Sequence, residues 1–150
     1  MPKSVLVLID TNIWVSAFVN RKGYPARVKE KFLKREFEIV ISTPLLKEVS
    51  DVLKRPRIKD QYKITDEEIE LFVEILAGIG HKVYLSEDIN LCRDHKDNMV
   101  LETAIKGGVD YLVTRDDDIK RDIQLIEELR KNGIKVVPVS KFLKMLGKQE

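Results

Sequence analysis

The most constraining feature of the chain is a short apolar run near its start that leads directly into an acid. Residues Ser4 to Ile9 read SVLVLI, and Asp10 follows. The run shows no alternation of polar and apolar residues, which is typical of a strand buried on both faces of a parallel sheet. In open α/β sheets, ligands bind outside the carboxyl ends of the strands. Asp10 is therefore the first candidate for a functional residue.

Apolar spacing and capping signals predict that strands and helices alternate along the rest of the chain. Strands are predicted at residues 4–10, 37–41, 82–85, 110–114 and 134–137. The first two helices are predicted to end near Asn20 and Arg35. The third is predicted to begin at Ser42 with a hydroxyl cap and to end at Pro56, and the fourth begins at Thr65 with a capping box. Two more are predicted at residues 97–106 and 119–131, and a last one begins at Ser140. Such alternation favours a parallel sheet with right-handed crossovers. The sequence thus predicts an α/β fold of three layers, α/β/α, with a central five-stranded parallel sheet.

Size and composition are those of an ordinary globular protein. A chain of 150 residues with 43% hydrophobic and 35% charged residues fits one domain, residues 1–150, because no linker divides it. The first apolar run is too short for a signal-peptide core or a membrane span, so we expect a cytoplasmic protein. Cys92 is the only cysteine, which excludes an intrachain disulfide and agrees with a reducing compartment.

Four acids recur at comparable places in the predicted elements. Asp10 ends the first strand, Glu48 lies in the helix after the second, Asp97 opens a helix, and Asp116 follows the fourth strand two residues after Thr114. Strand carboxyl ends and the amino ends of the following helices share one edge of the sheet, so the four can converge there. Each acid taken singly also has a structural explanation, because Asp favours helix amino ends.

Together the four acids predict a bound cation. Two carboxylates about 5 Å apart, at an effective dielectric near 20, repel each other by about 3 kcal/mol. A cluster of four near neutral pH therefore needs protons or cations. Oxygen ligands without a Cys or His cluster are the preference of Mg²⁺ or Mn²⁺ rather than zinc. Ions of this kind activate water and neutralise charge on a phosphodiester.

Other sites receive little support from the sequence. Cys92 and His95 have the spacing of half a zinc site, but there is no second pair. Glycine-rich nucleotide-binding motifs and a Walker lysine motif are absent. Neither histidine follows a nucleophile elbow, which argues against a serine or cysteine triad. We interpret Trp14 as a core residue rather than a base-stacking platform.

At these acids the sequence resembles the PIN domain family, the metal-dependent nuclease fold of VapC toxins and of RNA-processing enzymes. The most specific segment combines an acid-rich helix start, Gly-Gly-x-Asp-Tyr and a strand ending in Thr-x-Asp-x-Asp. The matching segments are LIDTNIWVSA (8–17), TPLLKEVSDVL (43–53), CRDHKDNMVLETAIKGGVDYLVTRDDDI (92–119) and IKVVPVSKFL (134–143). The third resembles the branch described as toxins of toxin-antitoxin pairs.

The resemblance implies roles for individual residues. The metal-binding acids correspond to Asp10, Glu48, Asp97 and Asp116, with Asp118 as a further outer ligand, and the polar positions that hold these acids or the metal-bound water correspond to Asn12 and Thr114. Arg115 departs from the pattern, since many relatives have Gly there. It is a possible RNA contact, and it can also partly neutralise Asp116. We interpret Asp94 and Asp117 as exposed loop acids.

We therefore expect a Mg²⁺- or Mn²⁺-dependent endoribonuclease that cleaves single-stranded RNA to 5′-phosphate and 3′-hydroxyl ends, and that acts as a toxin with an antitoxin protein as partner. Asp10, Asp97 and Asp116 would hold the metal, and Glu48 would orient or deprotonate the attacking water. Basic clusters at residues 21–35 and 54–63 would steer RNA. A homodimer is expected, with 63–80 as a contact surface. Two alternatives remain open: a non-catalytic RNA- or protein-binding PIN module, and a phosphorylatable receiver-like domain.

Overall fold

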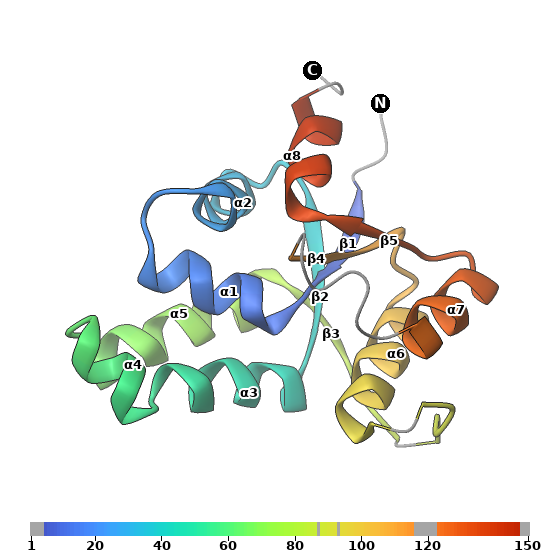
Figure 1. Ribbon diagram of the computed structural model, residues 1–150, viewed down its shortest axis with the longest axis horizontal. Helices are drawn as coiled ribbons and strands as arrows, with labels where there is room; N and C mark the ends of the chain where they lie inside the picture. The colour runs from blue at the N-terminus through green and yellow to red at the C-terminus, as the bar shows by residue number, and fades with distance from the viewer. Residues whose placement is uncertain (1–4, 87, 93, 116–122, 148–150) are drawn as a thin grey trace.

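A parallel sheet forms the centre of the computed structural model, which describes residues 5–86, 88–92, 94–115 and 123–147 (Figure 1). The strands in these residues are β1 (Leu6–Ile9), β2 (Glu38–Ser42), β3 (His81–Val83), β4 (Tyr111–Thr114) and β5 (Lys135–Pro138). Their order across the sheet is β3-β2-β1-β4-β5, and every neighbouring pair is parallel. The predicted five-stranded parallel sheet is confirmed.

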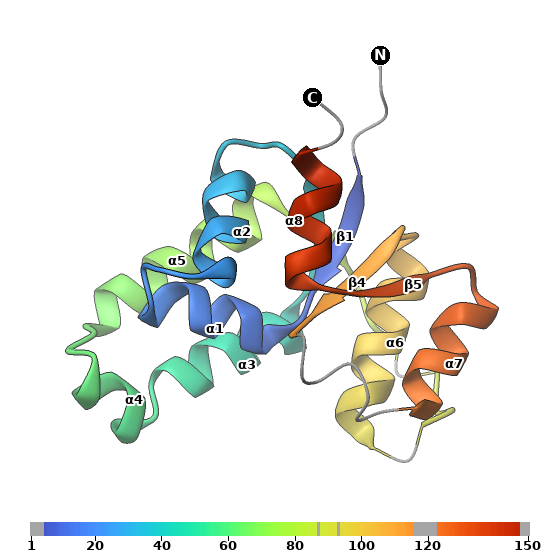
Figure 2. The ribbon, with the colours of Figure 1, turned by 45° about the horizontal axis from the view of Figure 1, so that its top comes forward.

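Helices cover both faces of the sheet, which confirms the predicted three layers (Figures 1 and 2). On one face lie α1 (Thr11–Val19), α2 (Tyr24–Leu33), α3 (Thr43–Leu53), α4 (Pro56–Gln61), α5 (Asp66–Ile79) and α8 (Val139–Gly147). On the other lie α6 (His95–Gly107) and α7 (Ile123–Lys131). None of the helices in the described part of the chain has both the length and the apolar character that crossing a bilayer requires.

The alternation of β1 side chains explains why its sequence is apolar throughout. Val7 and Ile9 pack in the core between the sheet and the larger group of helices, whereas Leu8 packs against α6 and α7. Trp14 lies in the first of these cores, only 3% exposed, with its ring edge-on to Phe32 at a centroid distance of 5.3 Å. The interpretation of Trp14 as a core residue agrees with this burial.

The ends of several elements differ from the sequence-based expectations. The helix expected to end at Pro56 ends just before it, at Leu53, but Pro56 is also the first residue of a short helix that was not predicted, α4, where a proline needs no hydrogen-bonded amide. Ser42 precedes α3 without a side-chain cap, because its hydroxyl instead accepts a hydrogen bond from Thr103 Oγ1 at 3.0 Å. The capping box at Thr65 is present as predicted.

The loop that enters α6 and the strand β3 are also displaced from prediction. The helix begins at His95 with Asp94 as its N-cap, two residues before the expected start at Asp97. The strand β3 covers His81–Val83 rather than residues 82–85. Of the predicted helix 119–131, the described part is α7, and residues 119–122 lie outside the described residues.

Candidate active site

A cleft of about 310 Å³ opens at the carboxyl edge of the sheet, beside the ends of β1 and β4. The starts of α1, α3 and α6 lie at this edge, in the lower half of the view in Figure 1. Three of the four predicted acids, Asp10, Glu48 and Asp97, line the cleft. Its other polar lining residues are Thr11, Asn12, Arg55, Asp94, Lys96 and Thr114. Residues more than 35 positions apart in sequence therefore meet in one depression.

Asp10 links the first strand to the first helix. Its backbone amide donates a hydrogen bond to the carbonyl of Val113 at 2.9 Å, so the end of β1 is held against β4. Its carboxylate is half-buried, and Oδ1 accepts a long hydrogen bond of 3.5 Å from the amide of Asn12 as the N-cap of α1. The amino end of α1 favours negative charge at this position. Asp10 is thus positioned by backbone contacts on both sides.

The side chain of Glu48 connects its own helix to two others. It lies on α3, and its half-buried carboxylate accepts a hydrogen bond from Thr11 Oγ1 of α1 at 3.3 Å. Its other oxygen, Oε1, lies 3.2 Å from Lys96 Nζ of α6. Leu45 and Val49 are buried beside it, so Glu48 lies at the margin of the apolar stripe of its helix.

Asp97 and Asp94 both line the cleft from the start of α6. Asp94 Oδ1 accepts a hydrogen bond of 2.8 Å from the amide of Lys96, whereas Asp97 lies in the first turn and is half-buried. Asp94 is exposed, as expected, but sequence reasoning missed its role as the cap and its place in the cleft. The spacing Asp-x-x-Asp, with a favoured cap residue at each end, was the available signal.

Asn12 and Thr114, the polar residues to which the family resemblance gives supporting roles, also lie at this edge. Thr114 is the buried last residue of β4, and its hydroxyl donates to the carbonyl of Arg115 at 3.2 Å. Asn12 is exposed and lines the cleft next to Asp10, whereas Arg115 is exposed and follows β4. The remaining acids of the predicted site, Asp116 and Asp118, and their neighbour Asp117 lie outside the described residues.

A buried polar network holds the loop that precedes α6. The side chain of Asn98 accepts a hydrogen bond from the amide of Cys92 at 2.8 Å and donates to its carbonyl at 3.0 Å. On the next turn Glu102, 1% exposed, accepts from the amide of Ser86 at 2.6 Å and from Lys106 Nζ at 2.7 Å. These contacts determine where the chain enters α6, and hence where Asp94 and Asp97 lie.

Burial and hydrogen bonding oppose each other at Glu102. Burial acts to raise the pKa of its carboxyl, but the hydrogen bonds from Lys106 and Ser86 outweigh burial and hold the pKa below its ordinary value. Glu102 is therefore a charged buried group near neutral pH. Sequence reasoning missed both Glu102 and Asn98, because a helical acid or amide gives no local sign that it is buried.

The donor set of the cleft fits a hard cation. Carboxylates, hydroxyls and an amide line it, and the lining residues in the described part of the chain include neither Cys nor His. Within the described ranges, no three acidic, His or Cys side chains gather closely enough to form a metal site on their own. Glu48 is engaged by Lys96 and Thr11 instead. The lining residues that the structure describes thus match Mg²⁺ or Mn²⁺ in chemistry, although their carboxylates are not gathered around a single point.

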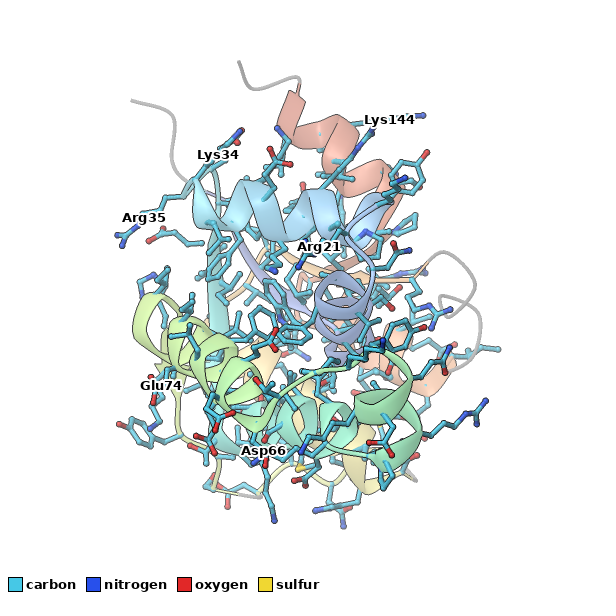
Figure 3. The ribbon with its side chains drawn as sticks, turned by 90° about the vertical axis from the view of Figure 1, so that its left-hand side faces the viewer. Arg21, Lys34, Arg35, Asp66, Glu74 and Lys144 are labelled. Atoms are coloured by element: carbon cyan, nitrogen blue, oxygen red, sulfur yellow. The ribbon has the colours of Figure 1, made fainter. Side chains whose placement is uncertain are left out.

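Basic residues are distributed unevenly around the molecule. Lys34 and Arg35 follow α2 and precede β2, at the amino edge of the sheet, and Figure 3 shows them at the end of α2, on the other side of the upper half of the view from Lys144 of α8. Of the cluster at residues 54–63, Arg55 lines the cleft. Among described residues, Arg55 and Lys96 are the cations in its lining.

Comparison with known proteins agrees with this architecture. The sequence profile of the PIN domain matches residues 6–118, from β1 past β4. The chain is also 24% identical over 115 residues to "Uncharacterized protein MJ1680" of Methanocaldococcus jannaschii, a match covering 77% of this chain and 73% of that protein. The profile covers more than half of the chain and includes Asp10, Glu48 and Asp97. The protein therefore belongs to the PIN domain family and has its nuclease-like fold.

Proposed function

We propose that this PIN domain is a Mg²⁺- or Mn²⁺-dependent endoribonuclease that cleaves single-stranded RNA in the cleft. The observation that supports this most is the meeting of Asp10, Glu48 and Asp97 from separate elements in one depression at the carboxyl edge of the sheet. Asp116 follows the end of β4 by two residues in the sequence. Helix capping accounts for Asp10 and Asp94, but Glu48 and Asp97 are not the cap residues of their helices, so capping does not explain their place in the cleft.

The residues that would hold the metal are Asp10, Asp97 and Asp116, with Asp118 as a further ligand. When bound, the dication supplies a Lewis acid that offsets phosphodiester charge and lowers the pKa of water. The two described members of this set, Asp10 and Asp97, supply carboxylate oxygens, which are the ligands that such an ion prefers.

Glu48 would act as the base. Its Oε2 is oriented by the hydroxyl of Thr11, and its carboxylate is half-buried, so it is held in place while remaining reachable from the cleft. In the proposed reaction Glu48 accepts a proton from the attacking water, the water oxygen bonds to phosphorus, and the bond from phosphorus to the 3′-oxygen breaks. The leaving oxygen takes up a proton, giving 3′-hydroxyl and 5′-phosphate ends. Arg55, at the edge of the cleft, would contact the RNA backbone.

The biological setting of the activity is a further part of the proposal. The likeness of residues 92–119 to toxin PIN domains supports a cytoplasmic toxin restrained by an antitoxin protein. We also propose a homodimer, which the resemblance to the family implies, with the apolar stripe of residues 63–80 in its interface. The competing candidate is a PIN module that binds RNA or protein without cleaving. It is favoured by the pairing of Glu48 with Lys96 and by the absence of a gathered set of acids among the residues that the structure describes.

We expect cleavage to require a divalent metal and Glu48. A 5′-labelled single-stranded RNA incubated with the protein and Mn²⁺ should be cut internally, EDTA should stop the reaction, and excess Mn²⁺ should restore it. Glu48→Gln should lower the rate by about 10²-fold or more, because it removes the proton acceptor while preserving shape. The products should carry 5′-phosphate ends and should therefore be substrates for RNA ligation.

The matched control is Glu127→Gln, which changes an exposed acid on α7 outside the residues that line the cleft. Its rate should equal that of the wild type. Cleavage that persists in EDTA, or equally in Glu48→Gln, would mean that the activity does not come from this cleft. Tight RNA binding without any cleavage would support the non-catalytic module.

A further inference from the structure

Lys96 places a positive charge inside an otherwise acidic part of the cleft. It lies in the first turn of α6, between Asp94 and Asp97 in the sequence, and its Nζ is 3.2 Å from Glu48 Oε1 on α3. The lysine side chain is 63% exposed, whereas that of Glu48 is 25% exposed. The ion pair therefore joins α3 to α6, and the lysine is its more exposed partner.

This ion pair reduces the electrostatic repulsion among the acids of the cleft. The Glu48 carboxylate receives the hydroxyl of Thr11 on one oxygen and the ammonium of Lys96 on the other. A cation entering the cleft would find this carboxylate already neutralised. Lys96 and a divalent metal are thus competitors for the same negative charge.

The ion pair between Lys96 and Glu48 is also weak enough to be displaced. Exposed lysine pairs are held weakly, because the ammonium is strongly hydrated and its stem is flexible. Released from Glu48, the ammonium would remain at the cleft edge, where Arg55 provides the other cation of the described lining. A lysine in that position is suited to a phosphate, which it binds as a point charge.

We propose that Lys96 is a displaceable counter-ion of Glu48: it neutralises the acid in the metal-free protein, leaves it when a divalent metal enters the cleft beside Glu48, and binds an RNA phosphate instead. The inference rests on the proposed function and extends it to the coupling between metal and RNA binding. A phosphate that draws Lys96 away restores the negative charge of Glu48 that attracts the metal, and a metal beside Glu48 repels Lys96 and makes it available to the phosphate. Metal and RNA then strengthen each other's binding, by the same factor in both directions.

The test compares Lys96→Met with Lys47→Met. Methionine keeps the length and helix propensity of the lysine, and the cap hydrogen bond from the backbone amide of Lys96 to Asp94 is unaffected. Lys47 is exposed on α3 next to Glu48 and lies outside the residues that line the cleft. Both variants lose one positive charge from the same region of the protein.

The first readout is Mn²⁺ affinity by calorimetry without RNA. Lys96→Met should bind Mn²⁺ about three- to tenfold more tightly than the wild type, because the competing charge is gone. Lys47→Met should stay within about twofold. The second readout is the affinity for a short single-stranded RNA in Ca²⁺, with the RNA shown to remain intact. Here Lys96→Met should bind about three- to tenfold more weakly, and the gain in RNA affinity on adding Ca²⁺ should shrink.

The outcomes separate this inference from the proposed function. If the wild type binds Mn²⁺ and cleaves RNA, but Lys96→Met binds Mn²⁺ no more tightly, the counter-ion role is wrong and the nuclease proposal stands. Unchanged RNA affinity in Lys96→Met would overturn the phosphate contact. If the wild type binds no Mn²⁺ at all, the proposed function fails, and the inference fails with it.

Discussion

Asp10→Asn is expected to remove metal-stimulated RNA cleavage while leaving the fold in place. Asparagine is nearly isosteric and caps helices as well as aspartate does, so the contact with the amide of Asn12 can be retained. The change removes the negative charge that a divalent metal needs at the end of β1. Replacing even an outer partner of a metal site typically costs about 10- to 100-fold, so we expect a loss of at least about 100-fold for a direct ligand.

The measurement is the initial rate of single-stranded RNA cleavage at saturating Mn²⁺, together with urea unfolding of both proteins. The unfolding free energy should change by less than about 1 kcal/mol. Asp51→Asn, at an exposed position on α3, controls for loss of one acidic charge and should keep full activity. Wild-type cleavage by Asp10→Asn in a clean preparation would remove Asp10 from the site.

Glu102→Ala should produce the largest loss of stability among the acids of the described residues. The change leaves Lys106 and the amide of Ser86 without the carboxylate that now accepts both hydrogen bonds. Breaking such a buried network should lower the unfolding free energy by about 2–4 kcal/mol, the lysine being partly exposed and able to regain water. Urea unfolding measures this, and Glu127→Ala, exposed on α7, should stay within about 0.5 kcal/mol.

The same carboxylate makes the stability of the protein depend on pH. Its pKa is lower in the folded protein than its ordinary value of 4.5, so folding favours the charged form. The stabilisation is complete above about pH 5.5 and is lost as the pH falls through the folded-state pKa. The difference between wild type and Glu102→Gln should therefore be largest near neutral pH and shrink in acid. A difference that grew on acidification would contradict this role of Glu102.

The sheet and its edge were accessible from sequence because they depend on local patterns. The apolar residues before Asp10 and before Thr114 indicate by themselves that both strands are buried. The parallel order follows from the alternation of strands and helices. Convergence of the acids in one cleft then follows from the topology alone. The same reasoning failed for α4, since Pro56 has identical local chemistry as a helix stop and as a first helical residue.

The missed features depend on contacts between distant segments. Ser42 has the residue type of a helix cap, but its hydroxyl is taken by Thr103 from 61 residues away. Lys96 looks like a solvated lysine on a helix start until α3 brings Glu48 to it. Asn98 and Glu102 are polar residues on an amphipathic helix, and only the packed loop reveals their burial. Local periodicity carries no information about such partners.

The proposed function requires that acids from separate elements bind a divalent cation in this cleft. X-ray diffraction from a crystal grown in Mn²⁺, with data collected at the manganese absorption edge, tests it most directly. We expect an anomalous peak within coordination distance of the carboxylates of Asp10 and Asp97, and loss of that peak in Asp10→Asn. An ordered cleft without such a peak in the wild-type protein at saturating Mn²⁺ would contradict it.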